Sequence, residues 1–458
     1  MKPRDKSGPW LWIILFGCLL VVLLAIILSR PERQPGGRVS AGSGETGAAA
    51  DATSAPAASA RQRKLSVPAV AATAEEIVAA KVSQFTRKRR ELARRLAREA
   101  NVTLSDEVER FFDAAEAGRY DEMQTLFDSL LARRRSDQGS EMDPYWRAIL
   151  EAQGAGESAR DWPAQKLLDF GNAVLGSLRP GMVYVGGTDP GCFIPNLMNE
   201  TGVTEPHIMF TQNALPDRSY LEYLRNLHGD RFNTLTKEEV DRIGEDYKAD
   251  ATKRLLHDQQ FPNEPRQVLP GEELKLGEDG NLQFANPIAV MGLSEQLFQA
   301  MLKKNPDVSF ALEESFPFRS TYAEAVPLGP VMELRVADAD TVFTGETATD
   351  TVRYWESTAQ QLRSDPGLTS DSHTMKTYAK LIASQAHLLE ARHFDDQAGQ
   401  AYRLALQLCP SSPEPVYNYI NLLMKKDRKP EAVTIAEGAV RADPGNGQLR
   451  DLLQRLRQ

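Results

Sequence analysis

The sequence predicts a single N-terminal transmembrane helix, an α/β central domain with a parallel sheet, and all-α helical hairpins toward the C-terminus. Three observations predict this fold class. Residues 10–29 form an uncharged run of 20 residues, strand-like apolar runs alternate with helical segments in mid-chain, and Pro410 and Pro444 lie 34 residues apart within a repeated pattern. A chain of 458 residues has room for two or three domains.

The uncharged run from Trp10 to Ser29 predicts a membrane anchor. It reads WLWIILFGCLLVVLLAIILS, and a helix of this length spans about 30 Å, the thickness of a bilayer's hydrocarbon core. A cleaved signal peptide has a shorter apolar region and a small-residue cleavage site, whereas Arg30-Pro31-Glu32-Arg33 follows here. We therefore favour an uncleaved helix, with Trp10 and Trp12 at the membrane interface.

The orientation of this helix depends on its flanks. Three basic residues precede it and three follow it, so the positive-inside comparison is a tie (Lys2, Arg4 and Lys6; Arg30, Arg33 and Arg38). The free amino terminus adds charge on the short side, and the Ala-, Gly-, Ser- and Thr-rich tract that follows is typical of a flexible linker. We expect a single-pass protein of the bacterial inner (cytoplasmic) membrane with extracytoplasmic C-terminal domains.

The predicted domain boundaries follow changes in composition. They give a short tail at residues 1–9, the anchor at 10–29, the linker at 30–72, a helical region at 73–160, the α/β domain at 161–340, and repeats with a capping helix at 372–458.

The cysteine and histidine content argues against a metal centre. The sequence has three cysteines, Cys18, Cys192 and Cys409, and six scattered histidines without metal-ligand spacing. Cys192 and Cys409 could form one bridge, but two buried free thiols are favoured. We expect no metal and no cofactor, and no motif in the sequence identifies a catalytic residue.

A basic helix is predicted over residues 73–100, where Thr73 and Glu76 have the spacing of a capping box. Residues 61–99 contain eleven Lys or Arg and four Asp or Glu. Such a surplus fits attraction to anionic lipid or to nucleic acid. It also fits a solvated helix face that pairs with the acidic remainder of the chain, which we favour. No aromatic residues alternate with the cations, so we expect no nucleic acid partner. A helical hairpin follows at residues 105–135.

The central segment predicts two parallel strands, at residues 182–185 and 207–211. The loop Gly186-Gly187-Thr188-Asp189-Pro190-Gly191 follows the first, with a helix beginning near Phe193, and Gln212 and Asn213 follow the second. Ligands of open parallel sheets bind beyond the carboxyl ends of the strands. The candidate ligand-binding residues are therefore Gly186, Gly187, Thr188, Asp189, Gln212 and Asn213.

Two interpretations of this loop stay open. Free backbone N–H groups at a helix start could hold an anion, although the loop has neither the lysine of a P-loop nor the GxGxxG pattern. Alternatively the loop is a sharp turn, in which Gly and Asp-Pro serve backbone shape alone.

VYVGGTDPG, followed by the Pro206-x-apolar-apolar-apolar-Thr-Gln-Asn strand, is similar to the soluble part of multi-span, protein O-mannosyltransferase-like bacterial membrane proteins. The resemblance covers residues 163–261. It implies an α/β soluble domain that tetratricopeptide repeats can follow. This chain has one predicted span in place of a membrane bundle, so the resemblance does not imply transferase activity.

The rest of the α/β domain carries weaker patterns. A helix is predicted over residues 235–260, hairpin arms at 274–276 and 282–284, a helix at 294–304, and strands at 308–312 and 331–336. Glu313 and Glu314 end the strand at 308–312. Adjacent strand residues point to opposite faces, so these carboxylates do not predict a catalytic dyad, and we expect surface charge.

The C-terminal region repeats a set of small residues at fixed offsets. Ala398, Tyr402, Ala405 and Pro410 recur as Ala432, Ala436, Ala439 and Pro444. This pattern resembles the tetratricopeptide family over residues 379–458, with residues 447–457 as the capping helix. The resemblance implies a concave surface that binds a partner protein or peptide. Asn418 and Asn421 are the candidate partner-binding residues, and a purely structural role covering the α/β domain is the alternative.

These patterns predict a membrane-anchored scaffold or adaptor of the bacterial envelope, which binds a partner protein through its repeats. The alternative is a glycan- or nucleotide-sugar-related binding module or enzyme, with a small anionic or sugar ligand at the Gly-Gly-Thr-Asp-Pro-Gly loop. A third reading is a structural member of a membrane complex.

Overall fold

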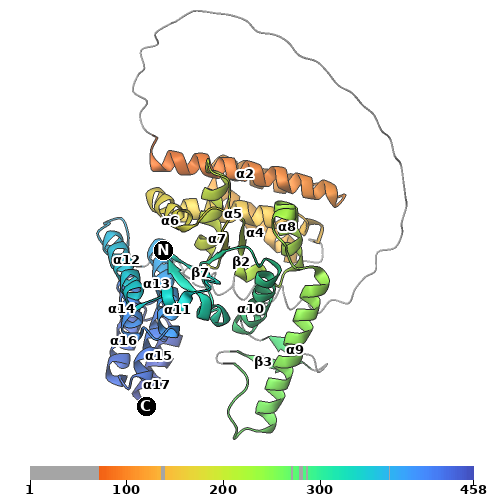
Figure 1. Cartoon of the computed structure of the whole chain (residues 1–458). Coiled ribbons are helices and arrows are strands. Elements are labelled where there is room, and N and C mark those ends of the chain that lie inside the picture. Colours follow the sequence, from red (N-terminus) through yellow and green to blue (C-terminus); the bar gives the residue numbers. More distant parts are fainter. Residues whose placement is uncertain (1–71, 136–139, 270–271, 278–281, 285–286, 371) are drawn as a thin grey trace, which may run out of the picture.

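The computed structural model describes residues 72–458 except 136–139, 270–271, 278–281, 285–286 and 371 (Figure 1). The predicted anchor at residues 10–29 and nearly all of the linker lie outside the described residues. Within the described part of the chain, no helix is both long enough and apolar enough to cross a bilayer.

The N-terminal helical region is a long helix with a hairpin and a fourth helix packed beneath it. Its elements are α2 (Ala74–Glu99), α3 (Asp106–Glu116), α4 (Tyr120–Arg135), the 3-10 turn η1 (Ser140–Met142) and α5 (Trp146–Asp161). The predicted capping box is confirmed: Thr73 Oγ1 accepts from the Glu76 N–H, and Glu76 accepts from the Thr73 N–H. The predicted hairpin is confirmed as α3 and α4, and Gly118 turns the chain between them with a φ of 70°.

The central sheet is mixed, which corrects the predicted parallel sheet. Its strands are β1 (Val183–Gly186), β2 (Met209–Thr211), β5 (Phe310–Leu312), β6 (Val326–Leu328) and β7 (Val331–Leu334), in the order β2-β1-β5-β7-β6. β1 pairs parallel with β2, as predicted, with Gly186 opposite Thr211, and it also pairs parallel with β5, with Val185 opposite Leu312. β6 was not predicted. It forms a tight hairpin with β7, and β7 runs antiparallel to β5.

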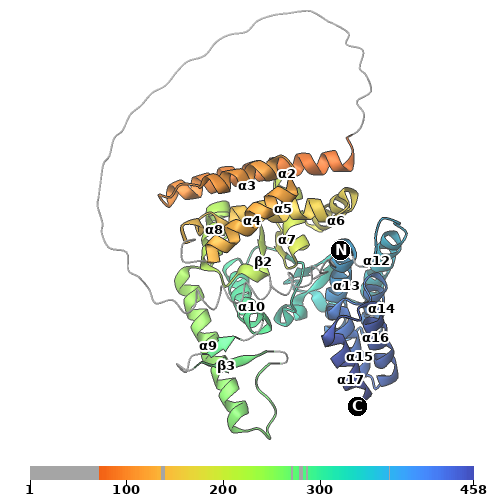
Figure 2. The ribbon, with the colours of Figure 1, turned by 180° about the vertical axis from the view of Figure 1, so that it is seen from behind.

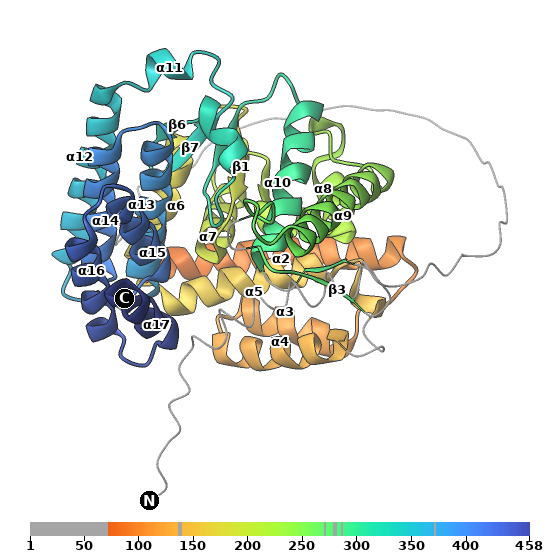
Figure 3. The same cartoon turned by 90° about the horizontal axis from the view of Figure 1, so that it is seen from below.

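Helices cover this sheet on several sides (Figure 3). They are α6 (Ala164–Ser177), α7 (Asp189–Glu200), α8 (Arg218–His228), α9 (Lys237–Gln260) and α10 (Pro287–Lys304), with short 3-10 turns η2 (Gln212–Ala214), η3 (Gly229–Arg231) and η4 (Arg319–Glu324). Phe298 of α10 packs against Phe210 and Phe310 of the sheet, with ring centroids 6.2 and 6.3 Å away. The predicted hairpin is confirmed as β3 (Leu274–Leu276) and β4 (Leu282–Phe284), which pair antiparallel beside α9.

The C-terminal part is a stack of helical hairpins, shown in blue in Figure 1. After α11 (Ala339–Val342) and α12 (Gly345–Arg363) come α13 (His373–Ala391), α14 (Asp395–Leu408), α15 (Pro413–Lys425), α16 (Lys429–Ala442) and α17 (Gly447–Arg457). The repeated alanines are fully buried at helix contacts. This architecture is compatible with a tetratricopeptide-like fold. No element was predicted for α12, which packs on α14 and extends the stack.

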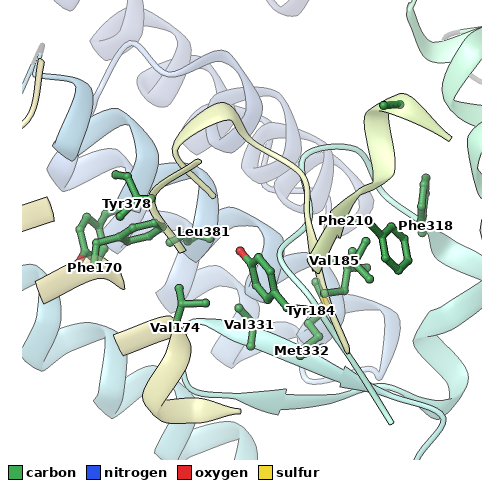
Figure 4. Packing of buried hydrophobic residues seen from close by; sticks show 14 of the residues in the cluster. Phe170, Val174, Tyr184, Val185, Phe210, Phe318, Val331, Met332, Tyr378 and Leu381 are labelled. Carbon is green, nitrogen blue, oxygen red and sulfur yellow. The ribbon is translucent and has the colours of Figure 1, made fainter. Parts of the chain in front are cut away.

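One apolar core joins the sheet to this stack. Phe170 of α6 lies edge-on to Tyr378 of α13 at 5.7 Å, and Figure 4 shows both beside Leu381. Val174 and Tyr184 continue the same packing toward Val331 of β7 (Figure 4). Seen from behind, the stack lies on one side of the sheet and α9 on the other (Figure 2). The first repeat hairpin is therefore part of the domain core.

Candidate functional site

The loop after β1 leads directly into α7. Thr188 is the N-cap: its backbone is extended, and its Oγ1 accepts from the Gly191 N–H at 3.0 Å. The helix begins at Asp189, with Pro190 in its first turn, so the predicted start near Phe193 was late by about one turn. The sequence signal was present, because Thr-Asp-Pro is a typical N-cap followed by an acidic residue and proline.

A carboxylate from the neighbouring strand fills this loop. Glu313 Oε2 accepts from the N–H groups of Gly187 and Thr188 at 2.6 and 2.8 Å, and Glu313 Oε1 accepts from Thr188 Oγ1 at 2.8 Å. Glu313 is 1% exposed. The predicted surface position of Glu313 is therefore wrong. Two N–H groups of the loop therefore donate to an internal carboxylate and are not free for an external anion.

Glycine is required where Glu313 approaches the loop. A Cβ on Gly191 would lie 2.1 Å from Glu313 Oε2, and a Cβ on Gly187 would lie 2.5 Å from the Glu313 carbonyl oxygen. The glycines are thus selected by a close internal contact, which favours the interpretation of this loop as a structural turn.

The candidates from the two strand ends do meet, as predicted. Asn213 Nδ2 donates to the Gly187 carbonyl at 2.5 Å, and Asn213 Oδ1 accepts from Ser315 Oγ at 3.2 Å. Gln212 is buried and donates to the Phe316 carbonyl at 3.3 Å. Gly186 ends β1 inside the sheet. Asn213 therefore joins the loop after β5 to the loop after β1, whereas the Gln212 side chain bonds the loop after β5.

Asp189 is the candidate that stays open to solvent. Its side chain is exposed and, within the described residues, makes no ion pair or hydrogen bond. The surrounding protein desolvates this carboxyl and raises its pKa, although the charges of Lys380 and Arg147 act against that rise.

We expect Glu313→Ala to lower the free energy of unfolding by about 3 kcal/mol, because three donors of the loop lose a buried acceptor. Urea denaturation of the purified full-length chain measures this change. Glu356→Ala, at an exposed position of α12, is the matched control and should change stability by less than about 0.5 kcal/mol. Equal stability of the two variants would contradict the role assigned to Glu313.

Glu314 points to the opposite face of the strand from Glu313, as the alternation predicts. It is also buried, so its predicted surface position is wrong. Its carboxyl accepts from the Phe318 N–H at 2.6 Å, from Tyr322 Oη at 2.8 Å and from Ser384 Oγ at 3.2 Å. Burial raises its pKa to about 8, against these hydrogen bonds. Since Ser384 belongs to α13, this carboxyl joins the sheet to the first repeat.

The C-terminal helices of the stack have a surface cavity. A solvent-open cavity of about 540 Å³ lies between α15 and α17, and we call it the terminal groove; it is lined by Tyr417, Gln448, Asp451, Gln454, Arg455 and Gln458. Of the two predicted partner-binding residues, Asn421 is exposed on α15 outside this lining, and Asn418 is half-buried beside His387. The groove residues were missed because α17 was treated only as a cap.

Cys192 and Cys409 form no disulfide, which agrees with the favoured prediction, although only Cys409 is fully buried. Among the described residues, no three His, Cys, Asp or Glu side chains gather as a metal site would require. Comparisons with models of protein families, with curated proteins and with solved structures gave no match. The function is therefore argued from the site geometry alone.

Proposed function

We propose that this protein is a membrane-anchored scaffold of the bacterial envelope, which binds a partner protein through the distal helices of its repeat stack. The observation that carries the proposal is the terminal groove between α15 and α17. Residues 10–29 supply the anchor in this proposal, with the C-terminal domains on the extracytoplasmic side.

The two ends of the helical stack differ in what they contact, and this difference supports the proposal. Helix α13 is already engaged with the domain: Gln385 Nε2 donates to the Val331 carbonyl at 2.6 Å, and Arg392 donates to the Ala323 carbonyl at 2.8 Å. The alternative role of the repeats, which is to cover the α/β domain, therefore fits the hairpin of α13 and α14. By contrast, the polar residues of α17 that line the groove are exposed, so they are available to a partner.

The groove offers both charges and an aromatic ring. Asp451 and Arg455 lie close enough to Tyr417 for their charges to act on its hydroxyl. Arginine and tyrosine are enriched among the residues that dominate binding at protein interfaces. A polar peptide segment or domain surface of a partner fits this lining better than an apolar ligand does.

A paired-variant cross-linking experiment tests the proposal. The double variant Asp451→Ala/Arg455→Ala changes the groove, and Thr434→Ala/Arg441→Ala changes exposed positions of α16 outside it. After cross-linking in intact cells, we expect a specific partner to co-purify with the wild type and the α16 control, and at least tenfold less with the groove variant. All three chains should melt at the same temperature.

Equal recovery of the partner with both variants would exclude the terminal groove as its binding site. Recovery of no partner at all would favour a structural role. The other proposal from the sequence, a glycan or nucleotide-sugar module or enzyme, retains one supporting observation, which is the unpaired and exposed Asp189. A ligand-induced rise in melting temperature that Asp189→Ala abolishes would favour it.

A further inference from the structure

An arm of the α/β domain gathers exposed apolar side chains. The arm consists of α9, the β3–β4 hairpin and the start of α10, and Figures 1 and 2 show α9 and β3 projecting from the body. Of the nine large apolar side chains that are exposed among the described residues, five lie on it: Leu256, Phe261, Leu269, Leu276 and Ile288. We call these five the arm patch. The arm also has a small separate core of Ala251, Leu274 and Ala289.

The arm is also acidic. Residues 237–290 contain seven Lys or Arg and twelve Asp or Glu, a balance of −5, whereas the whole chain has −9. More than half of the net negative charge therefore lies on this segment. Charge of this sign opposes contact with a second arm or with an anionic lipid surface. The occupant that fits is a basic segment with apolar side chains.

The chain itself contains such a segment just before α2. Residues 61–70 read RQRKLSVPAV, with three cations, no acidic residue, and Leu65, Val67 and Val70 as apolar side chains. Its charge and its apolar content both complement the arm.

The segment of the same molecule cannot reach the arm patch. It ends at the start of α2, and that helix of 26 residues is about 39 Å long. The far end of α2 contacts α8, where Arg95 donates to the Asn226 carbonyl at 3.5 Å. From there α9, with 24 residues, carries Leu256 about 30 Å and Phe261 about 36 Å farther along its axis, and Figure 1 shows it running away from α2. Ten fully extended residues span at most about 36 Å.

We propose that the arm patch of one copy binds residues 61–70 of a second copy, so that the protein self-associates head to tail. The contact is heterologous: the arm of each molecule takes the segment of the next. It uses surfaces distinct from the terminal groove, so it stands independently of the scaffold proposal.

Cysteine cross-linking between two differently tagged full-length chains tests this contact. One copy carries Val67→Cys and the other Leu276→Cys, and both are purified together in detergent. We expect a bismaleimide to join the two tags at a yield at least tenfold above a control pair of Val67→Cys with Val203→Cys, which is fully exposed on a loop outside the arm. Equal yields for the two pairs would overturn the proposal.

Charge and apolar variants provide a second readout by mass photometry. We expect Arg61→Glu/Arg63→Glu/Lys64→Glu and, separately, Leu256→Ser/Phe261→Ser to weaken self-association at least tenfold. The arm positions changed here are exposed, so these variants should keep the wild-type melting temperature. Self-association that persists unchanged in both variants would place the contact elsewhere, for example in the anchor. If the cysteine of Leu276→Cys reacts with a water-soluble maleimide in detergent but not in liposomes, the arm contacts lipid. Either result would overturn the proposal.

Discussion

Replacement of Arg89 by methionine should lower the free energy of unfolding by about 3–5 kcal/mol, the largest loss expected from a single substitution in the helical region. Arg89 is 2% exposed in the middle of α2. Its Nε donates to Glu151 Oε2 at 2.5 Å, its terminal nitrogens bind Glu200, and its guanidinium lies 4.3 Å over the Phe85 ring. Methionine keeps much of the volume but leaves Glu151 without its closest cation.

The electrostatics of Glu151 explain the size of this effect. Burial alone would raise the pKa of the Glu151 carboxyl, but the charges of Arg89 and Arg147 hold it below its usual value, and Tyr223 Oη donates to Oε2 at 2.8 Å. An uncompensated buried carboxylate is strongly destabilising. Urea denaturation at neutral pH measures the loss.

The matched control for Arg89→Met is Arg98→Met, which changes an exposed arginine of the same helix. It should change the stability by less than about 0.5 kcal/mol. A comparable loss in both variants would show that α2 depends on its overall basic charge and not on the buried contact.

Replacement of Glu314 by glutamine should stabilise the protein progressively as the pH rises from about 4.5 to above 8. The carboxyl has a pKa of about 8 in the fold, above the 4.5 of the exposed group. The fold therefore favours the protonated form, and its contribution to stability is complete at low pH and is lost as the pH rises through 8. A tenfold change in proton affinity corresponds to about 1.4 kcal/mol, so the loss amounts to at most about 5 kcal/mol.

Glutamine mimics the protonated carboxyl and removes this loss. Its amide oxygen can accept from Phe318 N–H, and its amide nitrogen can donate to Ser384 Oγ. Urea denaturation of the wild type and Glu314→Gln at several pH values measures the difference between them, which should grow with pH. Glu324→Gln changes an exposed residue of η4, and it should show the same pH dependence of stability as the wild type. A difference that does not change with pH would mean that Glu314 does not titrate in the fold.

Much of the secondary structure could be predicted because its signals are local. The capping box at Thr73 forms as its spacing predicts, since a cap involves residues only three positions apart. The same holds for the alternation at the end of β5, which correctly sends Glu313 and Glu314 to opposite faces. The burial of these two carboxylates could not be predicted, because the donors to Glu313 lie about 125 residues away in the chain and Glu314 is covered in part by Ser384, 70 residues away.

The functional candidates divide in the same way. The meeting of Asn213 with Gly187 could be expected if β1 and β2 are adjacent, because parallel neighbours bring their carboxyl ends to one edge. The terminal groove depends on how α17 packs against α15, and repeat spacing does not specify the lining of such a groove.

The sequence by itself determined the capping box at Thr73, the parallel direction of β1 and β2, and the position of the 34-residue repeat, since each depends on local spacing, on the order of elements or on periodicity. Only the tertiary structure decided that β7 and β6 make the sheet mixed, that Glu313 closes the Gly-Gly-Thr-Asp-Pro-Gly loop, and that the first repeat joins the domain core. The physical reason is burial. A glutamate next to a strand is expected at the surface unless the fold supplies hydrogen-bond donors to it, and the three donors to Glu313 come from a distant part of the chain.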